Sequence, residues 1–145
     1  MIQRIQSLWL LVAALFNAGL FYFSLYKADV MNEGVASMHE VTAGGNILLF
    51  LLAIVIVALP LVTIFMFKNR KQQSNLAKLS IVLNIGFIAA AIMVVTNFSN
   101  GTPTPTNGSY RLGMVLPIAS LVILLMAYNA IRKDIKTIKS LDRLR

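Results

Sequence analysis

Four long apolar stretches dominate the chain. They cover residues 8–25, 47–67, 79–98 and 112–131. Each approaches the ~20 residues that an α-helix needs to cross a hydrocarbon core ~30 Å thick. The second stretch has no charged residue and lacks the polar stripe that a helix in a soluble bundle would carry. The pattern therefore predicts four transmembrane helices.

The connections between these stretches are polar. Residues 26–46 form an acidic loop that ends in a turn, and the weak alternation within it allows a short hairpin over part of its length. Residues 100–109 are rich in Pro, Gly and Asn and predict a mobile, turn-rich cap. We therefore predict an all-α polytopic membrane protein: a four-helix transmembrane bundle over residues 1–131, then a basic amphipathic tail over residues 132–145.

Composition supports lipid as the solvent and narrows the chemistry. Of 145 residues, 58% are hydrophobic and 12% are charged, whereas a soluble domain carries about 25% charged residues. The absence of cysteine excludes disulfides and thiol chemistry, and the single histidine, His39, excludes a multi-histidine metal site within one chain. We expect neither a metal nor another cofactor.

The basic residues set an expected orientation. Eleven of the 13 Lys and Arg residues lie before the first stretch, between the second and third, or after the fourth. The positive-inside rule then places both termini in the cytoplasm of a bacterial inner membrane. Because these residues flank membrane ends, anionic lipid headgroups account for the net charge of +8, and we expect no nucleic-acid partner.

A few polar or small residues interrupt the apolar stretches. Asn17, Thr63 and Asn84 are candidates for helix packing or for lining a polar pocket, and Gly86 is a candidate for close helix contact. No Asp, Glu, Lys, Arg or His lies within the four stretches, which argues against an ion-coupled carrier. Counted along the predicted helices, Asn17 and Asn84 differ in depth by about 7 Å, so a direct bond between them requires a tilt or stagger.

Proline interrupts the second stretch at Pro60. A proline removes one backbone hydrogen bond, and neighbouring helices can satisfy the freed carbonyl. A packing role is the simplest interpretation of this residue.

The tail carries the most specific pattern. Apolar residues recur at positions 131, 135, 138, 141 and 144 and form a stripe on one helix face. This helix either lies along the inner leaflet or docks onto a partner. The candidate residues for docking to a partner or to lipid are Arg132, Lys133, Asp134, Lys136, Lys139, Asp142, Arg143 and Arg145.

The start at residues 1–7, the four stretches and the ending at residues 131–145 resemble an uncharacterised family of bacterial inner-membrane proteins, a domain of unknown function typical of the Bacteroidota. In that family an acidic residue often follows the Arg-Lys-Asp of the tail, whereas Ile135 stands here. The resemblance implies the four-span architecture and adds no catalytic residue.

These observations predict a non-enzymatic inner-membrane protein. No serine has a plausible base, and acidic residues at metal-binding spacing are missing from the basic segments. We expect an accessory or scaffolding subunit that docks onto other inner-membrane proteins through its helix faces and its tail. The alternative is a small transporter, or a module that binds a lipid or small molecule, with a polar pocket between its helices.

Overall fold

The computed structural model describes residues 2–32, 35–101 and 105–142, and most of these residues are helical. The four helices are α1 (Ile2–Ala18), α2 (Ile47–Phe65), α3 (Arg70–Ser99) and α4 (Leu112–Asp142). The three strands are β1 (Tyr26–Asn32), β2 (Val35–Val41) and β3 (Thr106–Tyr110). Two short 3-10 turns, η1 (Gly19–Phe21) and η2 (Ala43–Gly45), follow α1 and precede α2.

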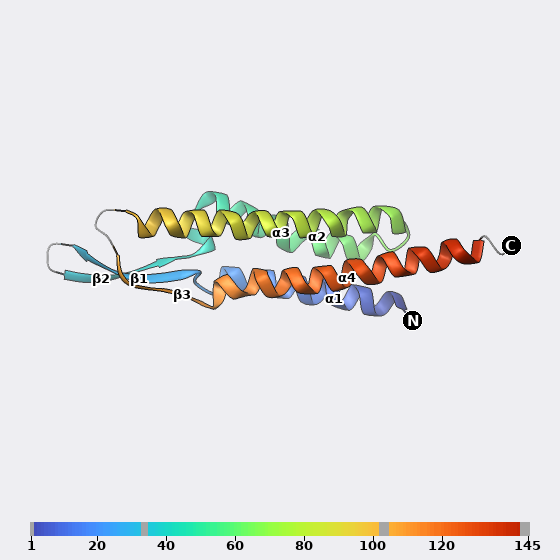
Figure 1. Cartoon of the computed structure of the whole chain (residues 1–145), viewed down its shortest axis with the longest axis horizontal. Helices are drawn as coiled ribbons and strands as arrows, with labels where there is room; N and C mark the ends of the chain where they lie inside the picture. Colours follow the sequence, from blue (N-terminus) through green and yellow to red (C-terminus); the bar gives the residue numbers. More distant parts are fainter. Residues whose placement is uncertain (1, 33–34, 102–104, 143–145) are drawn as a thin grey trace.

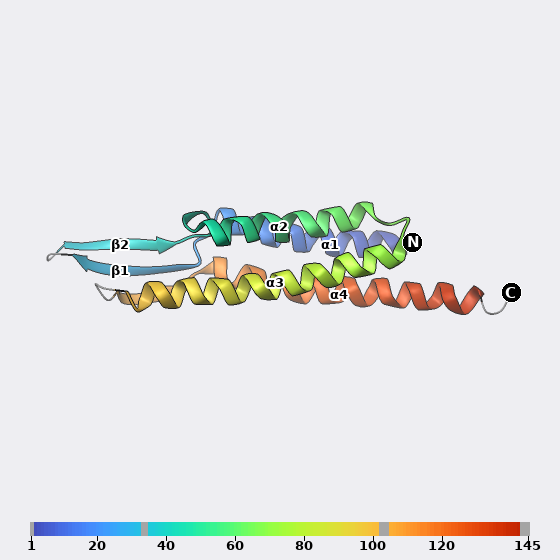
Figure 2. The same cartoon turned by 90° about the horizontal axis from the view of Figure 1, so that it is seen from above.

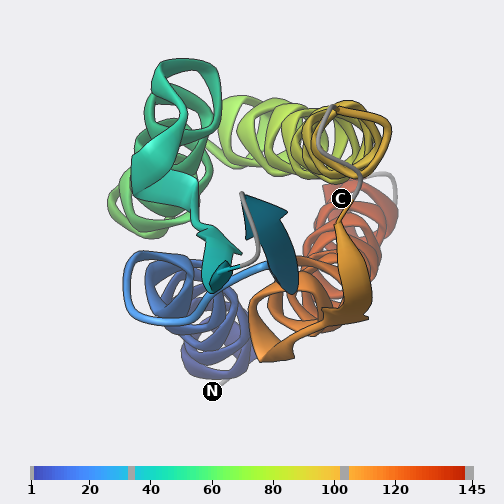
Figure 3. The ribbon, with the colours of Figure 1, turned by 90° about the vertical axis from the view of Figure 1, so that its left-hand side faces the viewer.

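The four helices pack side by side around a common centre. α1 and α3 each contact both α2 and α4, and the view along the long axis shows the helices at four corners (Figure 3). The start of α1, the α2–α3 connection and the end of α4 lie together at one end of the molecule, which we call the basic end (Figures 1 and 2). The strands lie at the opposite end, the sheet end.

Three of the four predicted membrane helices are confirmed as long apolar helices. α2, α3 and α4 are each long and apolar enough to span a membrane. The first apolar helix is shorter, covering Ile5–Phe21. The predicted end of this helix, residue 25, was too late in the sequence. The helical backbone ends with η1, and the N–H of Leu25 donates to the carbonyl of Val41, at 2.8 Å.

Asparagine side chains cap the N-termini of two of the helices. Asn46 accepts hydrogen bonds from the N–H groups of Leu48 and Leu49 at the start of α2, and Asn69 accepts one from Gln72 at the start of α3. Such N-caps satisfy backbone donors that have no partner within the helix. α3 therefore begins well before residue 79, where its apolar stretch starts.

A three-stranded antiparallel sheet, in the order β2-β1-β3, corrects two predictions. The protein is not all-α, and residues 106–109 of the expected mobile cap belong to β3. β1 and β2 form the hairpin that the sequence allowed, with Tyr26 opposite Val41. β3 pairs with the other edge of β1, with Tyr26 opposite Tyr110 and a register shift between Lys27 and Asp29.

Two glycines allow close approach at the sheet end. A Cβ added to Gly108 would lie 1.6 Å from the hydroxyl of Tyr26. A Cβ added to Gly113 would lie 2.6 Å from the carbonyl oxygen of Ser24, to which the Gly113 N–H donates at 3.1 Å. Both positions therefore exclude any side chain without local rearrangement.

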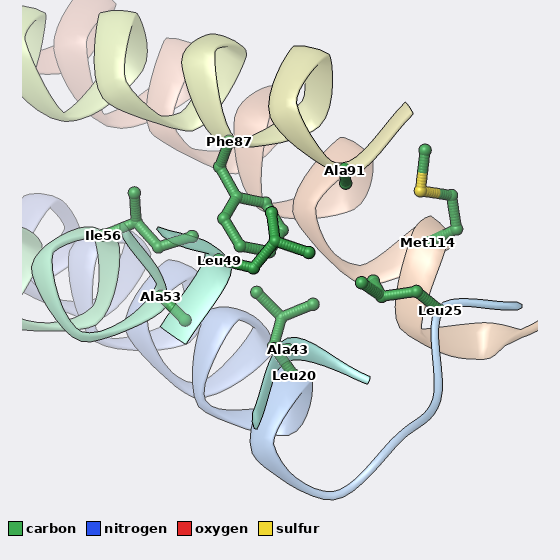
Figure 4. Packing of buried hydrophobic residues seen from close by; sticks show 9 residues of the cluster. All are labelled: Leu20, Leu25, Ala43, Leu49, Ala53, Ile56, Phe87, Ala91 and Met114. Atoms are coloured by element: carbon green, nitrogen blue, oxygen red, sulfur yellow. The ribbon is translucent and has the colours of Figure 1, made fainter. Parts of the chain in front are cut away.

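The interior consists of stacked apolar clusters. In the sheet-end half, the Phe87 ring lies among side chains from η1, α2 and α4 and from the segments that lead into the sheet (Figure 4). Leu10, Ala13, Leu124 and Ala127 belong to a second cluster nearer the basic end. Tyr26 joins the sheet to α3, because its ring packs edge-on against Phe98 at 6.2 Å between centroids.

The distribution of burial fits a hydrocarbon surrounding. Asn17 and Asn84 are 0% exposed, whereas Leu15 and Met93, on the same helices, are 63% and 69% exposed. Soluble proteins keep large contiguous apolar surfaces out of water. Polar side chains inside and apolar ones outside are the arrangement expected of helices in lipid.

Candidate functional site

Two groups of polar side chains stand out: a cluster in the middle of the helices and a groove at the basic end. The central cluster begins with Asn17 on α1. Its amide Nδ2 donates to the carbonyl of Ile56 on α2, at 3.1 Å. Ile56 lies four residues before Pro60, whose ring nitrogen has no hydrogen to donate. Asn17 thus satisfies the carbonyl that the proline leaves free.

The same cluster reaches α3 and α4. Asn84 donates from Nδ2 to Oδ1 of Asn17 at 3.3 Å and to Oγ of Ser120 at 3.1 Å. Ser120 in turn donates to the carbonyl of Ala13 at 3.3 Å. Asn17, Asn84 and Ser120 are all fully buried. Through these bonds the cluster joins all four helices, although Oδ1 of Asn84 has no donor among the described residues.

The direct Asn17–Asn84 bond follows from where the helices begin. Asn17 lies 15 residues after the first residue of α1, and Asn84 lies 14 residues after the first residue of α3. The expected difference in depth was wrong because it was counted from the apolar stretches instead of the helix starts. No stagger is needed to bring the two amides together.

The other two packing candidates lie outside this cluster. The hydroxyl of Thr63 donates to the carbonyl of Leu59 within α2, and the carbonyl of Thr63 accepts from Nε2 of Gln73 at 3.4 Å. Thr63 and Gln73 therefore form a separate buried link between α2 and α3. Gly86 is exposed, and a Cβ added there would meet nothing within 4 Å among the described residues, so Gly86 makes no close contact with another helix in that part of the chain.

An ion pair fixes α4 against α3 at the basic end. Arg70, the first residue of α3, pairs with Asp134 of α4. Their side chains are only 22% and 11% exposed. One turn deeper, Gln6 of α1 donates to the carbonyl of Ala130 on α4, at 3.2 Å. Asp134, which the sequence placed among the docking residues, is thus engaged within the chain.

A groove of about 600 Å³ lies between α3 and α4 next to this ion pair. Five of its lining residues are basic. Within the described part of the chain, no carboxylate lines the groove. The lining consists of Lys71, Ser74, Asn75, Lys78, Tyr128, Arg132, Ile135, Lys136 and Lys139. Because the charged residues in its lining are all cations, this concave surface attracts anions.

Tyr128 holds two of these cations together. The Lys78 Nζ lies 5.9 Å from the centre of the Tyr128 ring, and the Arg132 guanidinium lies 5.7 Å from it. Cations over an aromatic face are stabilised by the ring quadrupole. The ring therefore forms part of the groove's lining, with one cation from each helix beside it.

The groove brings together only part of the predicted docking set. Arg132, Lys136 and Lys139 line it, and Lys133 lies outside its lining. The side chain of Asp142, and Arg143 and Arg145, lie outside the described residues.

Sequence reasoning missed the α3 side of the groove. Lys71 and Lys78 were interpreted only as topology signals, and Tyr128 was not among the candidate site residues. The seven-residue spacing of the two lysines does place them on one helix face. Nothing in the sequence showed that this face meets α4.

Fold and surface define a small, mostly helical protein whose long apolar helices are those of a membrane-spanning protein, with a basic groove at one end. Over residues 2–144 the chain matches the family described as "Domain of unknown function (DUF4293)", and it belongs to that family. The resemblance to an uncharacterised family is therefore confirmed. No curated protein and no solved structure matches the chain.

Proposed function

We propose that this protein is a non-enzymatic, accessory or scaffolding subunit of a bacterial inner-membrane complex. In this proposal α1 is a fourth membrane span, so that α1 to α4 form a four-helix transmembrane bundle. The basic end faces the cytoplasm, as the positive-inside rule requires. Both termini then lie on the same side, in agreement with the position of the start of α1 and the end of α4 at one end of the molecule (Figure 1).

The observation that carries this proposal is the continuation of α4 beyond the other helices. α4 runs without a break to Asp142, and its last turns extend past the starts of α1 and α3 (Figure 1). Residues 136–140 in this projection are all exposed, including Ile138 at 42%. A rigid, exposed helix with apolar and basic positions is a surface suited to docking a partner.

The arrangement of the central cluster supports a scaffold over the alternative transporter. Asn17 and Ser120 donate to helix carbonyls, and Asn84 donates to both of them. Polar groups that are used to join helices contribute to packing. The cluster therefore stabilises a fixed arrangement in this proposal and does not line a pathway.

The test is purification of the tagged full chain in a mild detergent, followed by quantitative mass spectrometry. We expect one membrane protein at a constant, near-stoichiometric ratio. A chain that ends at Ile135 keeps Asp134 for Arg70 and removes the projection, so it should lose the partner and remain folded. Repeated isolation of the full chain alone, or equal recovery of the partner by the shortened chain, would contradict the proposal.

A further inference from the structure

The groove between α3 and α4 has two layers of charge. Lys78 immediately precedes the apolar stretch of α3, and Arg132 immediately follows that of α4. Both lie beside the Tyr128 ring. This inner layer therefore lies where the apolar surface of the helices ends, which is the level of lipid phosphates for a chain placed in a bilayer.

The outer layer lies farther from the apolar surface. Lys71 precedes Lys78 by seven residues on α3, and Lys139 follows Arg132 by seven residues on α4. Seven residues of an α-helix advance about 10 Å. Lys136 lies between the two layers on α4. Lysine side chains are long enough to extend from the outer layer back toward phosphates held at the level of the inner layer, and a headgroup with two phosphates offsets more of the five positive charges than a headgroup with one.

The neighbouring carboxylate does not neutralise this charge. Asp134 is held by Arg70, and the groove's lining, as far as the structure describes the chain, contains no carboxylate. Five cations around one concavity repel one another unless an anion enters. The volume of about 600 Å³ admits a headgroup much larger than one phosphate.

We propose that this groove binds the headgroup of a membrane lipid that carries two phosphate groups, a cardiolipin-type lipid. Both phosphates lie at the level of Lys78 and Arg132, and the side chains of Lys71, Lys136 and Lys139 extend toward them from farther out. The lipid chains remain in the bilayer beside α3 and α4. The inference uses the membrane placement of the proposed function and is independent of any protein partner.

The experiment measures lipid binding to the purified full chain in a nonionic detergent by native mass spectrometry. Cardiolipin is titrated against phosphatidylglycerol, which has one phosphate, at equal total phosphate. We expect cardiolipin to bind at least tenfold more tightly. The Lys78→Gln/Arg132→Gln variant should weaken cardiolipin binding by about 30-fold, because each cation near the surface contributes about fivefold.

A variant with the same change in net charge provides the control. Lys68 and Lys133 are exposed basic residues at the same end that do not line the groove. The Lys68→Gln/Lys133→Gln variant should change binding less than threefold. Equal weakening in both variants would mean attraction by net charge alone and would overturn the proposal, as would equal affinity for the two lipids.

Soluble pyrophosphate distinguishes a lipid from a free anion. Pyrophosphate has two linked phosphates and no acyl chains, so we expect millimolar concentrations to displace little cardiolipin. Displacement at micromolar concentrations would assign the groove to a soluble ligand and overturn the lipid assignment. Circular dichroism of each variant confirms that the helices are retained, and a missing protein partner leaves these results unchanged.

Discussion

The side-chain amide of Asn17 on α1 donates a 3.1 Å hydrogen bond to the backbone carbonyl of Ile56 on α2. That carbonyl lacks its usual donor because residue 60, four positions later, is Pro60. An unsatisfied carbonyl is costly in hydrocarbon. The proline of one helix and the asparagine of another thus form a single structural unit, and Asn84 and Ser120 extend it to the remaining two helices.

We predict that Asn17→Leu lowers the free energy of unfolding by about 1–2 kcal/mol, because the Ile56 carbonyl loses its donor. Unfolding in mixed micelles, followed by circular dichroism, measures the change. Asn97 provides a matched control, since it is exposed near the sheet end of α3. The same substitution there should change stability by less than about 0.5 kcal/mol.

The link to the proline is tested by a double-mutant cycle. Pro60→Ala restores an N–H that can donate to the Ile56 carbonyl, so Asn17→Leu should cost less in that background than in the natural chain. The expected coupling is about 0.5–1.5 kcal/mol. Strict additivity of the two substitutions would show that Asn17 does not serve this carbonyl.

The ion pair between Arg70 and Asp134 should couple the start of α3 to α4. Asp134 is 11% exposed, so Asp134→Asn leaves a largely buried guanidinium without its counter-charge. We predict a loss of about 1–3 kcal/mol in unfolding free energy. The Arg70→Gln/Asp134→Asn double variant should lose less than the sum of the two single changes.

The exposed pair at the sheet end is the comparison for this ion pair. Lys27 and Glu40 face each other across β1 and β2 with side-chain exposures of 28% and 38%. Because exposed pairs contribute little, Glu40→Gln should cost no more than about 1 kcal/mol. A larger effect for Glu40→Gln than for Asp134→Asn would reverse the expected order.

The sheet should be sensitive to a single methyl group at Gly108. Gly108→Ala forces the added Cβ into Tyr26, and overpacking of this kind costs about 1–3 kcal/mol. Gly44→Ala is the control, because nothing lies within 4 Å of its added Cβ. Hydrogen exchange of the β1 amides measures the result: faster exchange is expected for Gly108→Ala only, and equal exchange in both variants would contradict the packing of Tyr26 over Gly108.

The helices were largely readable from the sequence, and the sheet was not. The apolar stretches at 79–98 and 112–131 lie within α3 and α4, and the stretch at 47–67 ends two residues beyond α2. They could be located because the hydropathy of a helix depends on the solvent around it. β3 is a five-residue polar strand that pairs with a strand far away in the chain. Such pairing leaves no local periodicity, so residues 106–109 were predicted only as part of a turn-rich cap.

Helix starts and helix faces account for the remaining differences. Hydropathy indicates where the apolar stretch begins, at residue 79. The helix itself begins nine residues earlier, at Arg70, where Asn69 is the N-cap. Counted from this helix start, Asn84 lies at the same level as Asn17. The sequence identified both amides and suggested that a neighbour serves the Pro60 carbonyl, but it did not identify Asn17 as that neighbour. The groove could not be predicted from the sequence either, because only the contact between α3 and α4 brings Lys78 and Arg132 to the same Tyr128 ring.

The central claim is that the chain crosses the membrane with its basic end in the cytoplasm. The natural chain has no cysteine, so single cysteines report accessibility without background. Lys136 is exposed at the basic end, and Met38 is 67% exposed in β2 at the sheet end. The measurement is labelling of the Lys136→Cys and Met38→Cys variants in intact spheroplasts with a membrane-impermeant thiol reagent. We predict labelling of Met38→Cys at once and of Lys136→Cys only after permeabilisation, whereas the opposite pattern, or labelling of both in intact spheroplasts, would contradict the account.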